Sequence, residues 1–567
     1  MLAGPIFTRE ATTAPRQLRH FLVRAGYVAA LFVLMYTADQ AVFGWQQVRS
    51  IGDTARFGSL LFAIFSLVQL PLVLFFAMIF CAGSIAQEKD RRTLLLLLMT
   101  DLSARELVLG KLTASLLIVM VLIGVSTPVF FLVQLLGGVS WEQIVWVLSL
   151  CVAVAVASGS WGALVAFWRE KTFQTLAIGV LGIVGFLGVV EASVALLGEL
   201  DWLTALNPFR TLLTVLDPFA RDRDPVAFRS IVALTGLGLA LIGITVWRLR
   251  AWNPSRTTYV QPEEETDASS GETRVRHRRI WSNPVIWREI RTRAYGRKVQ
   301  LIKLAYLLLA AAVAFVLAND DGRSLLMNRI PPGSLGVVGL SLLSLLLINA
   351  QAVTSLTSER DGKTLDLLLA TDISAGEFIY GKLGGIAYNT KELIVVPLAL
   401  AAWQAAAGDM LWETFAFLVL GFSTLVAFAA MLGLHSSLTF EGSRAAIGNS
   451  LGTLFFLFIG IFIFLMLLVE ASGSLASQLL SFVVFIGLGS ICLWASLTHK
   501  NPSPALTLAA SWLPFMTFYS ITEFLREGTL SVCLAIVAVY GFTSLAMLVP
   551  AVSAFDVALG RTTGDRG

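Results

Sequence analysis

The sequence predicts an all-α integral membrane protein made of two homologous halves. Of its 567 residues, 56% are hydrophobic and 14% are charged, whereas soluble domains carry about 25% charged residues. Long apolar runs alternate with short charged clusters, as membrane spans alternate with their loops. A 25-residue motif also occurs twice, once in each half. The net charge of +4 is too small to indicate a nucleic-acid partner.

Each half contains enough apolar runs for six membrane-spanning helices, since one span needs about 20 apolar residues. The first predicted domain, residues 1–250, has runs at 21–36, 57–82, 112–136, 143–168, 173–197 and 228–247. The second, residues 283–567, has core runs at 301–317, 334–357, 383–406, 411–434, 447–470 and 530–552. An extra apolar run, residues 480–497, has no counterpart in the first half.

The number of spans near the C-terminus is left open by the sequence. Twelve core spans are expected, and the total becomes thirteen if residues 480–497 also cross. It becomes fourteen if residues 505–519 cross as well, although Pro514 in that stretch disfavours a plain helix.

Lysine and arginine cluster in alternate loops, which places those loops and the N-terminus in the cytoplasm. The chain is thus expected to be a multi-pass protein of a cell's inner (plasma) membrane. Between the halves, residues 251–282 are expected to form a largely disordered cytosolic linker, because they contain the polar segment PEEETDASSG.

Metal and catalytic sites are not indicated. The four cysteines lie in apolar runs without metal-ligand spacing, and the four histidines are isolated from one another. Gly362-Lys363-Thr364 supplies only the last letters of a phosphate-binding P-loop, and Thr357 stands where its first glycine is required. The chain is therefore not expected to be an enzyme.

The repeated motif follows the second span of each half. Residues 88–112 read EKDRRTLLLLLMTDLSARELVLGKL and residues 359–383 read ERDGKTLDLLLATDISAGEFIYGKL, with 15 of 25 positions identical. A weaker match links residues 5–10 with 284–289, at the start of each half. Such self-similarity indicates an internal repeat.

Each copy of the motif is predicted to form a helical elbow at the membrane surface. Its apolar stretch, 93–99 or 364–370, is too short to cross a bilayer and is flanked by charge. Ser103 with Glu106, and Ser374 with Glu377, have the spacing of a capping box and should start the third span. The lysine of each Gly-Lys pair is expected to reach the membrane interface, while the glycine allows close helix packing.

The pattern E-x-x-x-x-T-L-x-x-L-L-x-T-x-x-S-x-x-E-x-x-x-G-K resembles the loop between spans two and three of ABC-2-type transporter permeases. The basic segments 5–19 and 284–298 are similar to that family's surface helix before the first span. The first copy has Arg91 where the second has Gly362, and a glycine is usual in the family. Most of the chain fits two such permease domains fused in sequence.

The resemblance implies that the elbows are coupling helices, which dock into ATPase subunits. ATP and Mg²⁺ would be bound by two copies of a partner ATPase, and this chain itself would bind no cofactor. The residues carried into the coupling region by their motif positions are Glu88, Asp90, Thr93, Leu94, Asp101, Gly110, Lys111, Glu359, Asp361, Thr364, Leu365, Asp372, Gly381 and Lys382. Ordinary helix caps in positively charged cytoplasmic loops are the alternative interpretation of the elbows.

The function expected is that of an exporter permease driven by a partner ATPase across the inner membrane. A membrane scaffold that works with an ATPase is one alternative. An ion-gradient-driven transporter is another, although it needs ionisable residues deep in the spans. Glu191 and Glu470 each precede Ala-Ser near the end of span five. They are either a pair of pathway carboxylates or solvated helix-end residues, and the second interpretation is favoured.

Overall fold

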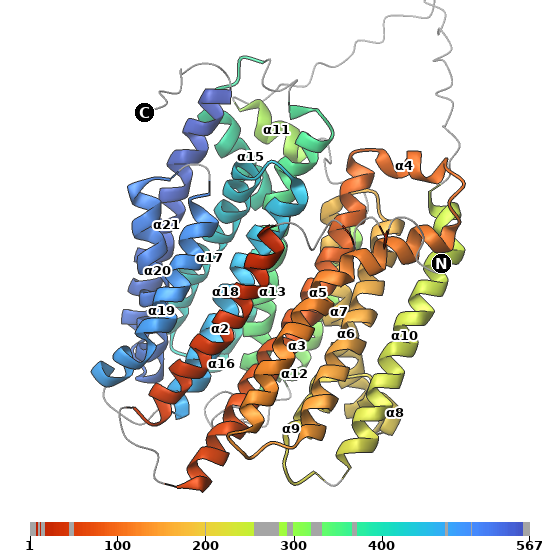
Figure 1. The fold of residues 1–567 in the computed structure, drawn as a ribbon. Helices are drawn as coiled ribbons and strands as arrows, with labels where there is room; N and C mark the ends of the chain where they lie inside the picture. Colours follow the sequence, from red (N-terminus) through yellow and green to blue (C-terminus); the bar gives the residue numbers. More distant parts are fainter. Residues whose placement is uncertain are drawn as a thin grey trace, which may run out of the picture.

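The computed structural model is a bundle of long helices (Figure 1). It describes residues 7–8, 12, 18–44, 50–198, 200–220, 222–253, 283–291, 299–318, 332–365, 371–470, 475–499 and 502–558. No strand occurs among these residues. Most of the linker and of the first basic arm lie outside the described residues, as do 366–370 of the second elbow.

Nine helices are described in the first half after residue 17, six long and three short. In chain order the long helices are α2 (Leu18–Val42), α3 (Ile51–Asp90), α5 (Ala104–Gln134), α6 (Trp141–Trp168), α7 (Thr172–Leu197) and α10 (Arg223–Trp252). The short helices are α4 (Thr93–Leu98), α8 (Asp201–Ala205) and α9 (Pro208–Leu216).

Among the described residues, the spans of the second half follow the same order, with changes in the third span and after the fifth. Its helices are α11 (Pro284–Arg291), α12 (Val299–Ala318), α13 (Pro332–Asp361), α15 (Ala375–Asn389), α16 (Lys391–Ala407), α17 (Trp412–Thr439), α18 (Ser443–Glu470), α19 (Leu475–Leu497), α20 (Pro504–Leu525) and α21 (Thr529–Ala558). The third span is divided into α15 and α16, and α19 and α20 stand where the first half has α8 and α9.

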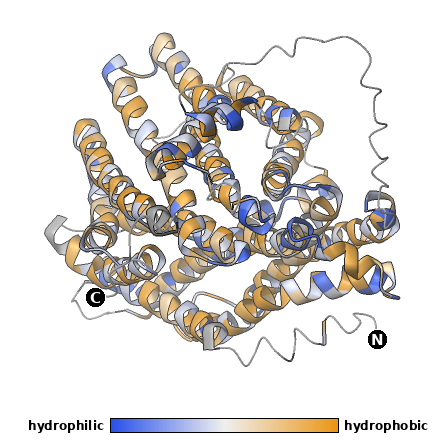
Figure 2. Cartoon of the chain, turned by 90° about the horizontal axis from the view of Figure 1, so that it is seen from above, coloured by the Kyte–Doolittle hydropathy of each residue, from blue (hydrophilic) through white to orange (hydrophobic). Residues whose placement is uncertain are grey.

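Twelve of the described helices are long and apolar enough to cross a membrane. The protein is therefore an all-α, multi-pass membrane protein. Figure 2 shows hydrophobic residues along most of the helices. We call the end of the bundle where α3 and α13 finish the elbow face, and the opposite end the far face; α21 also ends on the elbow face (Figure 1).

The twelve helices are not the twelve core runs of the sequence. The extra run is helix α19 and is one of them, while the expected span 383–406 is two helices of 15 and 17 residues. The break falls at a polar stretch whose first-half equivalents are apolar: Asn389 to Glu392 align with Ile118 to Val121. There the Thr390 hydroxyl donates to the Ile386 carbonyl at 2.9 Å. Lys303 of α12 donates to both oxygens of Glu392.

Helix α20 runs through Pro514, so the expectation that this proline disfavours a helix is wrong. At 1.5 Å per residue its 22 residues extend about 33 Å, roughly the thickness of a bilayer core. It packs against α18, α19 and α21. Helices α19 and α20 thus form an antiparallel pair, and α21 can return to the elbow face.

The two halves lie side by side and meet through their first, second and fifth spans, and α2 also packs on α19. Helix α2 packs on α18 and α12 packs on α7, so each first span contacts the other half's fifth span. Helix α3 contacts α18, and α13 contacts α7 in the same way. Phe455 of α18 lies 5.0 Å from Phe75, centroid to centroid. These reciprocal contacts are what a pseudo-two-fold axis between the halves requires.

A pair of equivalent glycines lets the fourth span approach the second in each half. A Cβ added at Gly162 of α6 would lie 2.5 Å from the Met78 carbonyl oxygen. One added at Gly433 of α17 would lie 2.6 Å from the Ala352 Cβ and 2.8 Å from the Val353 nitrogen. Small residues at such crossings bring helix backbones into contact.

We predict that Gly433→Leu lowers the thermal midpoint of the purified chain, because overpacking a tight contact costs about 1–3 kcal/mol. Gly448→Leu is the matched control, since a Cβ at Gly448 meets nothing within 4 Å. Equal midpoints for the two variants, measured in detergent, would contradict the packing described.

Candidate functional site

Each elbow begins where the second span ends, at a residue in the left-handed backbone region. Arg92 has φ 59° and Lys363 has φ 56°, and these two residues occupy the same position in the repeat. Thr93 and Thr364 then donate from their hydroxyls to the carbonyls of Glu88 and Glu359, at 3.2 and 3.1 Å. The left-handed residue follows Arg91, whose own φ is −79°, so Arg91 fits where the second copy has Gly362.

The third span of each half starts at the expected capping box. Ser103 accepts from the Glu106 amide at 3.2 Å while the Glu106 carboxylate accepts from the Ser103 amide at 3.0 Å. Ser374 and Glu377 make the same two bonds at 3.2 and 3.0 Å. Two amides that the first helical turn leaves unpaired are satisfied in this way. The direction in which α5 and α15 leave the elbow is therefore fixed.

The lysine of each Gly-Lys pair points inward, so the expectation that it reaches the membrane interface is wrong. Lys111 forms an ion pair with Glu88, which lies one span back. Lys382 is 1% exposed and pairs with Glu359 at 2.9 Å and with Glu289 of α11 at 2.6 Å. Two carboxylates within reach repay the cost of burying the ammonium group, which a lone lysine could not do.

The basic arm of the second half is part of this ion-pair cluster. Arg288 of α11 pairs with Glu359 and, at 3.2 Å, with Glu289. A Cβ added at Gly381 or Gly385 of α15 would lie 2.6 Å from Val285 or Glu289, so both positions must stay small for α11 to pack. In the first half, Arg9 and Glu10 are the sequence equivalents of Arg288 and Glu289, and they lie outside the described residues.

The residue after each glutamate binds the end of the fourth span. Lys89 donates to the carbonyls of Phe167 and Arg169 at 2.5 and 3.0 Å. Arg360 donates to those of Ser437 and Phe440 at 2.9 and 2.6 Å. The last carbonyls of a helix lack partners within it and carry partial negative charge, so a cation is favoured there.

The aspartate that follows binds the start of the fifth span. Thr172, the first residue of α7, donates from its hydroxyl to Asp90. Ser443, the first residue of α18, donates to Asp361 at 2.5 Å. A carboxylate is favoured at this end of a helix because the dipole there is positive.

We call each tripeptide at the end of the second span a brace: Glu88-Lys89-Asp90 and Glu359-Arg360-Asp361. Successive helical residues point about 100° apart, so three consecutive side chains reach three different neighbours. One brace thereby joins the second span to the third, fourth and fifth spans of its half. The sequence motif includes the acids, but Lys89, Arg360, Thr172, Ser443 and Glu289 were not predicted. Their matching positions in the two halves are the signal that could have identified them.

The expected coupling residues divide between the inside and the surface of the elbows. Leu94, Gly110, Gly381 and Lys382 are buried, and Glu88, Asp90, Lys111, Glu359, Asp361 and Leu365 are partly buried. Thr93, Asp101, Thr364 and Asp372 are exposed. Two apolar residues on or just after α4 are also exposed, Leu96 at 64% and Met99 at 68%. The outer surface of the first elbow therefore has an apolar patch, Leu96 and Met99, beside polar groups.

At the elbow face, Arg91, the residue after the first brace, forms an ion pair with Asp361 of the second brace. Arg91 Nε lies 3.4 Å from Asp361 Oδ1, and the Asp361 side chain is 4% exposed. The second half cannot supply the reciprocal cation, because Gly362 is the equivalent of Arg91. The contact between the elbows is therefore asymmetric.

The two glutamates near the end of span five lie at different positions along their helices. Glu191 is the twentieth residue of α7, whereas Glu470 is the last of the 28 residues of α18. Counted from the equivalent residues Thr172 and Ser443, they are eight residues apart, about 12 Å along a helix. Both oxygens of Glu191 bind Arg210 at 2.8 Å, and the side chain of Glu470 is outside the described part of the chain.

Residues 6–250 match the family model described as ABC-2 family transporter protein. No curated protein and no solved structure matches the chain. Within the described residues, no group of three or more histidine, cysteine or acidic side chains could hold a metal ion.

We predict that Lys382→Met destabilises the fold by about 3–5 kcal/mol, because it leaves buried carboxylates without their ammonium partner. Lys111→Met is the matched variant and should cost less, since Lys111 is 17% exposed and one ion pair is described for it. Thermal midpoints of the two variants check this order. The reverse order, or no loss in Lys382→Met, would contradict the buried pair.

Proposed function

We propose that the chain is the permease of an ATP-driven exporter whose ATPase is a separate protein, because residues 6–250 match the model of the ABC-2 transporter family. Residues 283–567 then form a second permease half after the linker 251–282. ATP and Mg²⁺ bind to the partner, so the chain itself supplies the path and not the hydrolysis. The elbow face lies in the cytoplasm and the chain in the inner membrane.

The brace is the observation that supports this function best. A force applied at one elbow acts directly on the second span, and through three side chains on the third, fourth and fifth spans. Such a connection is what a permease needs if a partner on one side of the membrane is to move its spans. Both halves contain it, which fits two ATPase subunits, one at each elbow.

The docking surface proposed is the exposed side of each elbow. In the first elbow this is the patch of Leu96 and Met99, with Thr93 and Asp101 as polar neighbours. An exposed apolar patch with a polar rim is typical of a protein contact site. Thr364 and Asp372 are the exposed counterparts of Thr93 and Asp101 in the second elbow.

The structure suggests how two docked ATPases would produce movement. Closure of an ATPase pair on ATP would shift the elbows relative to each other, and the Arg91–Asp361 pair lies between them. Rearrangement there would rock one half against the other across the contacts of the first, second and fifth spans. Rocking of two repeats about their shared axis is the usual basis of alternating access.

We predict that the chain co-purifies with its natural ATPase at about two copies, one per elbow, and that Leu96→Glu with Met99→Glu reduces this to about one. A charge introduced into an apolar contact weakens binding to the partner. Because both positions are exposed, the fold of the chain itself should be unaffected. Leu135→Glu is the control, since Leu135 is 86% exposed on the far face.

No ATPase with the natural chain, purified from its own membrane, would contradict the proposed function and favour a scaffold or a gradient-driven transporter. Two copies retained by the double variant would place the docking surface elsewhere.

A further inference from the structure

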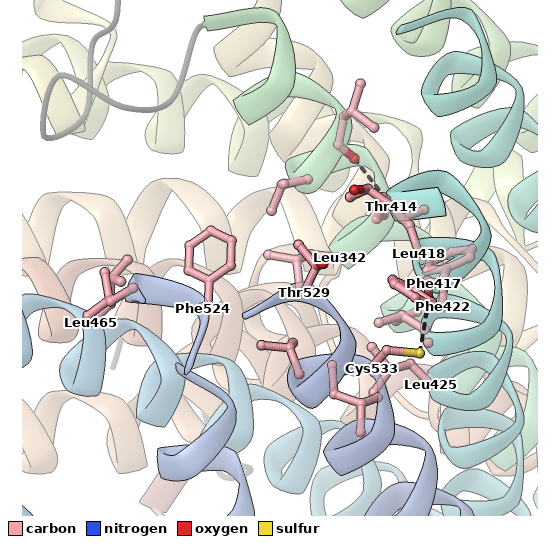
Figure 3. A pocket seen from close by; sticks show the side chains of 18 of the residues that line it. Leu342, Thr414, Phe417, Leu418, Phe422, Leu425, Leu465, Phe524, Thr529 and Cys533 are labelled. Atoms are coloured by element: carbon pink, nitrogen blue, oxygen red, sulfur yellow. Dashed lines mark hydrogen bonds between the residues drawn. The ribbon is translucent and has the colours of Figure 1, made fainter. Parts of the chain in front are cut away.

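A cavity of about 680 Å³ opens between α13, α17, α20 and α21, near the far face of the second half. Figure 3 shows its walls, which are formed largely by leucine and phenylalanine side chains such as Leu342, Phe417 and Phe422. The polar lining residues include Thr414 and Thr529, at the far-face ends of α17 and α21, and Glu527 in the turn before α21. Its volume is that of a small-molecule site.

The corresponding place in the first half is filled by a helix. Helix α9 packs against α3, α6 and α10, the equivalents of α13, α17 and α21. It buries Leu212 and Val215, and the Val215 carbonyl accepts from the Gln143 side-chain amide at 2.9 Å. Gln143 is the repeat equivalent of Thr414, which lines the cavity.

The segment after span five is longer in the second half than in the first, and this explains why no helix fills the cavity there. In the second half α19 and α20 replace α8 and α9, and α20 packs on α18, α19 and α21. Pro514 of α20 follows the same Pro-Phe pattern as Pro208, the first residue of α9. The helix that would fill the space has therefore become part of the α19–α20 pair.

The first half has a smaller cavity of about 360 Å³ that lies farther from the far face, with Pro208 of α9 in its lining. Leu74 and Val154 line it, and their equivalents Leu345 and Leu425 line the larger cavity. The two cavities thus overlap only at this level, and the rest of the larger one extends toward the far face, where α9 packs in the first half.

We propose that this cavity binds the hydrocarbon chain of a single-chain amphiphile, with the head group at the far face beside Thr414, Glu527 and Thr529. The walls offer no charge to an ionic ligand below that rim, and burial of methylenes there is favourable at about 0.8 kcal/mol each. Helix α9 shows which chemistry the space accepts, since three of the four residues that it buries, Pro208, Leu212 and Val215, are apolar. The site does not depend on coupling to an ATPase.

Cys533 provides a test, because it lines the cavity and its thiol donates to the Phe417 carbonyl at 3.5 Å. The natural chain, held in an amphipathic polymer, is treated with N-ethylmaleimide with and without palmitoyl lysophosphatidylcholine. Alkylation of each cysteine is followed by peptide mass spectrometry. Cys492 is the internal control, since it is exposed on α19 and does not line the cavity.

We expect the lipid to slow alkylation of Cys533 roughly tenfold at about ten times its Kd, by mass action, while Cys492 reacts at an unchanged rate. Equal slowing of both cysteines would mean only that the lipid coats the chain, and an unchanged rate at Cys533 would show that the cavity is not occupied. Either result overturns the proposal.

A second measurement uses variants. Gly421 lines the cavity, and the nearest atom to an added Cβ is 4.0 Å away, so Gly421→Phe fills the space without displacing packed atoms. Native mass spectrometry should show the lysolipid bound to the natural chain and to the control Gly487→Phe on α19, but not to Gly421→Phe. Retention by Gly421→Phe would place the lipid elsewhere.

Discussion

The arrangement of both halves depends on contacts made by three consecutive charged residues at the end of the second span, one an ion pair and two hydrogen bonds to helix ends. Their side chains leave the helix about 100° apart, so each brace holds the third, fourth and fifth spans at one level. The partners are either an opposite charge or a helix end of opposite polarity, and both are strong where water is scarce. The elbow is therefore rigidly joined to the spans behind it.

The halves share this brace but differ where they would meet other molecules. Arg91 replaces a glycine and contacts Asp361 across the boundary, so the elbows form one asymmetric pair. On the far face, α19 and α20 replace two short helices and leave an apolar cavity that α9 fills in the first half. The repeat thus keeps the brace and varies the contact between the elbows and the segment after span five.

Much of the fold could be predicted because its causes are local. Hydropathy marks the spans, and the S-x-x-E spacing marks the starts of α5 and α15. The roles of Lys89 and Arg360 could not be predicted, because their partners are carbonyls about 80 residues away. The inward turn of Lys382 depends on Glu289, 93 residues earlier. Glu191 and Glu470 share the same short sequence pattern but not the same position along their helices, because the number of residues before each glutamate differs.

The most direct measurement is the nucleotide-dependent distance between spin labels at Leu135 and Ala406, equivalent exposed residues on the far face of the two halves. It is made on the complex with the ATPase, before and after ATP is trapped. The natural chain should show a shift that Lys89→Met with Arg360→Met loses while still binding the ATPase. The same shift in both proteins would contradict the brace as the connection between elbow and spans.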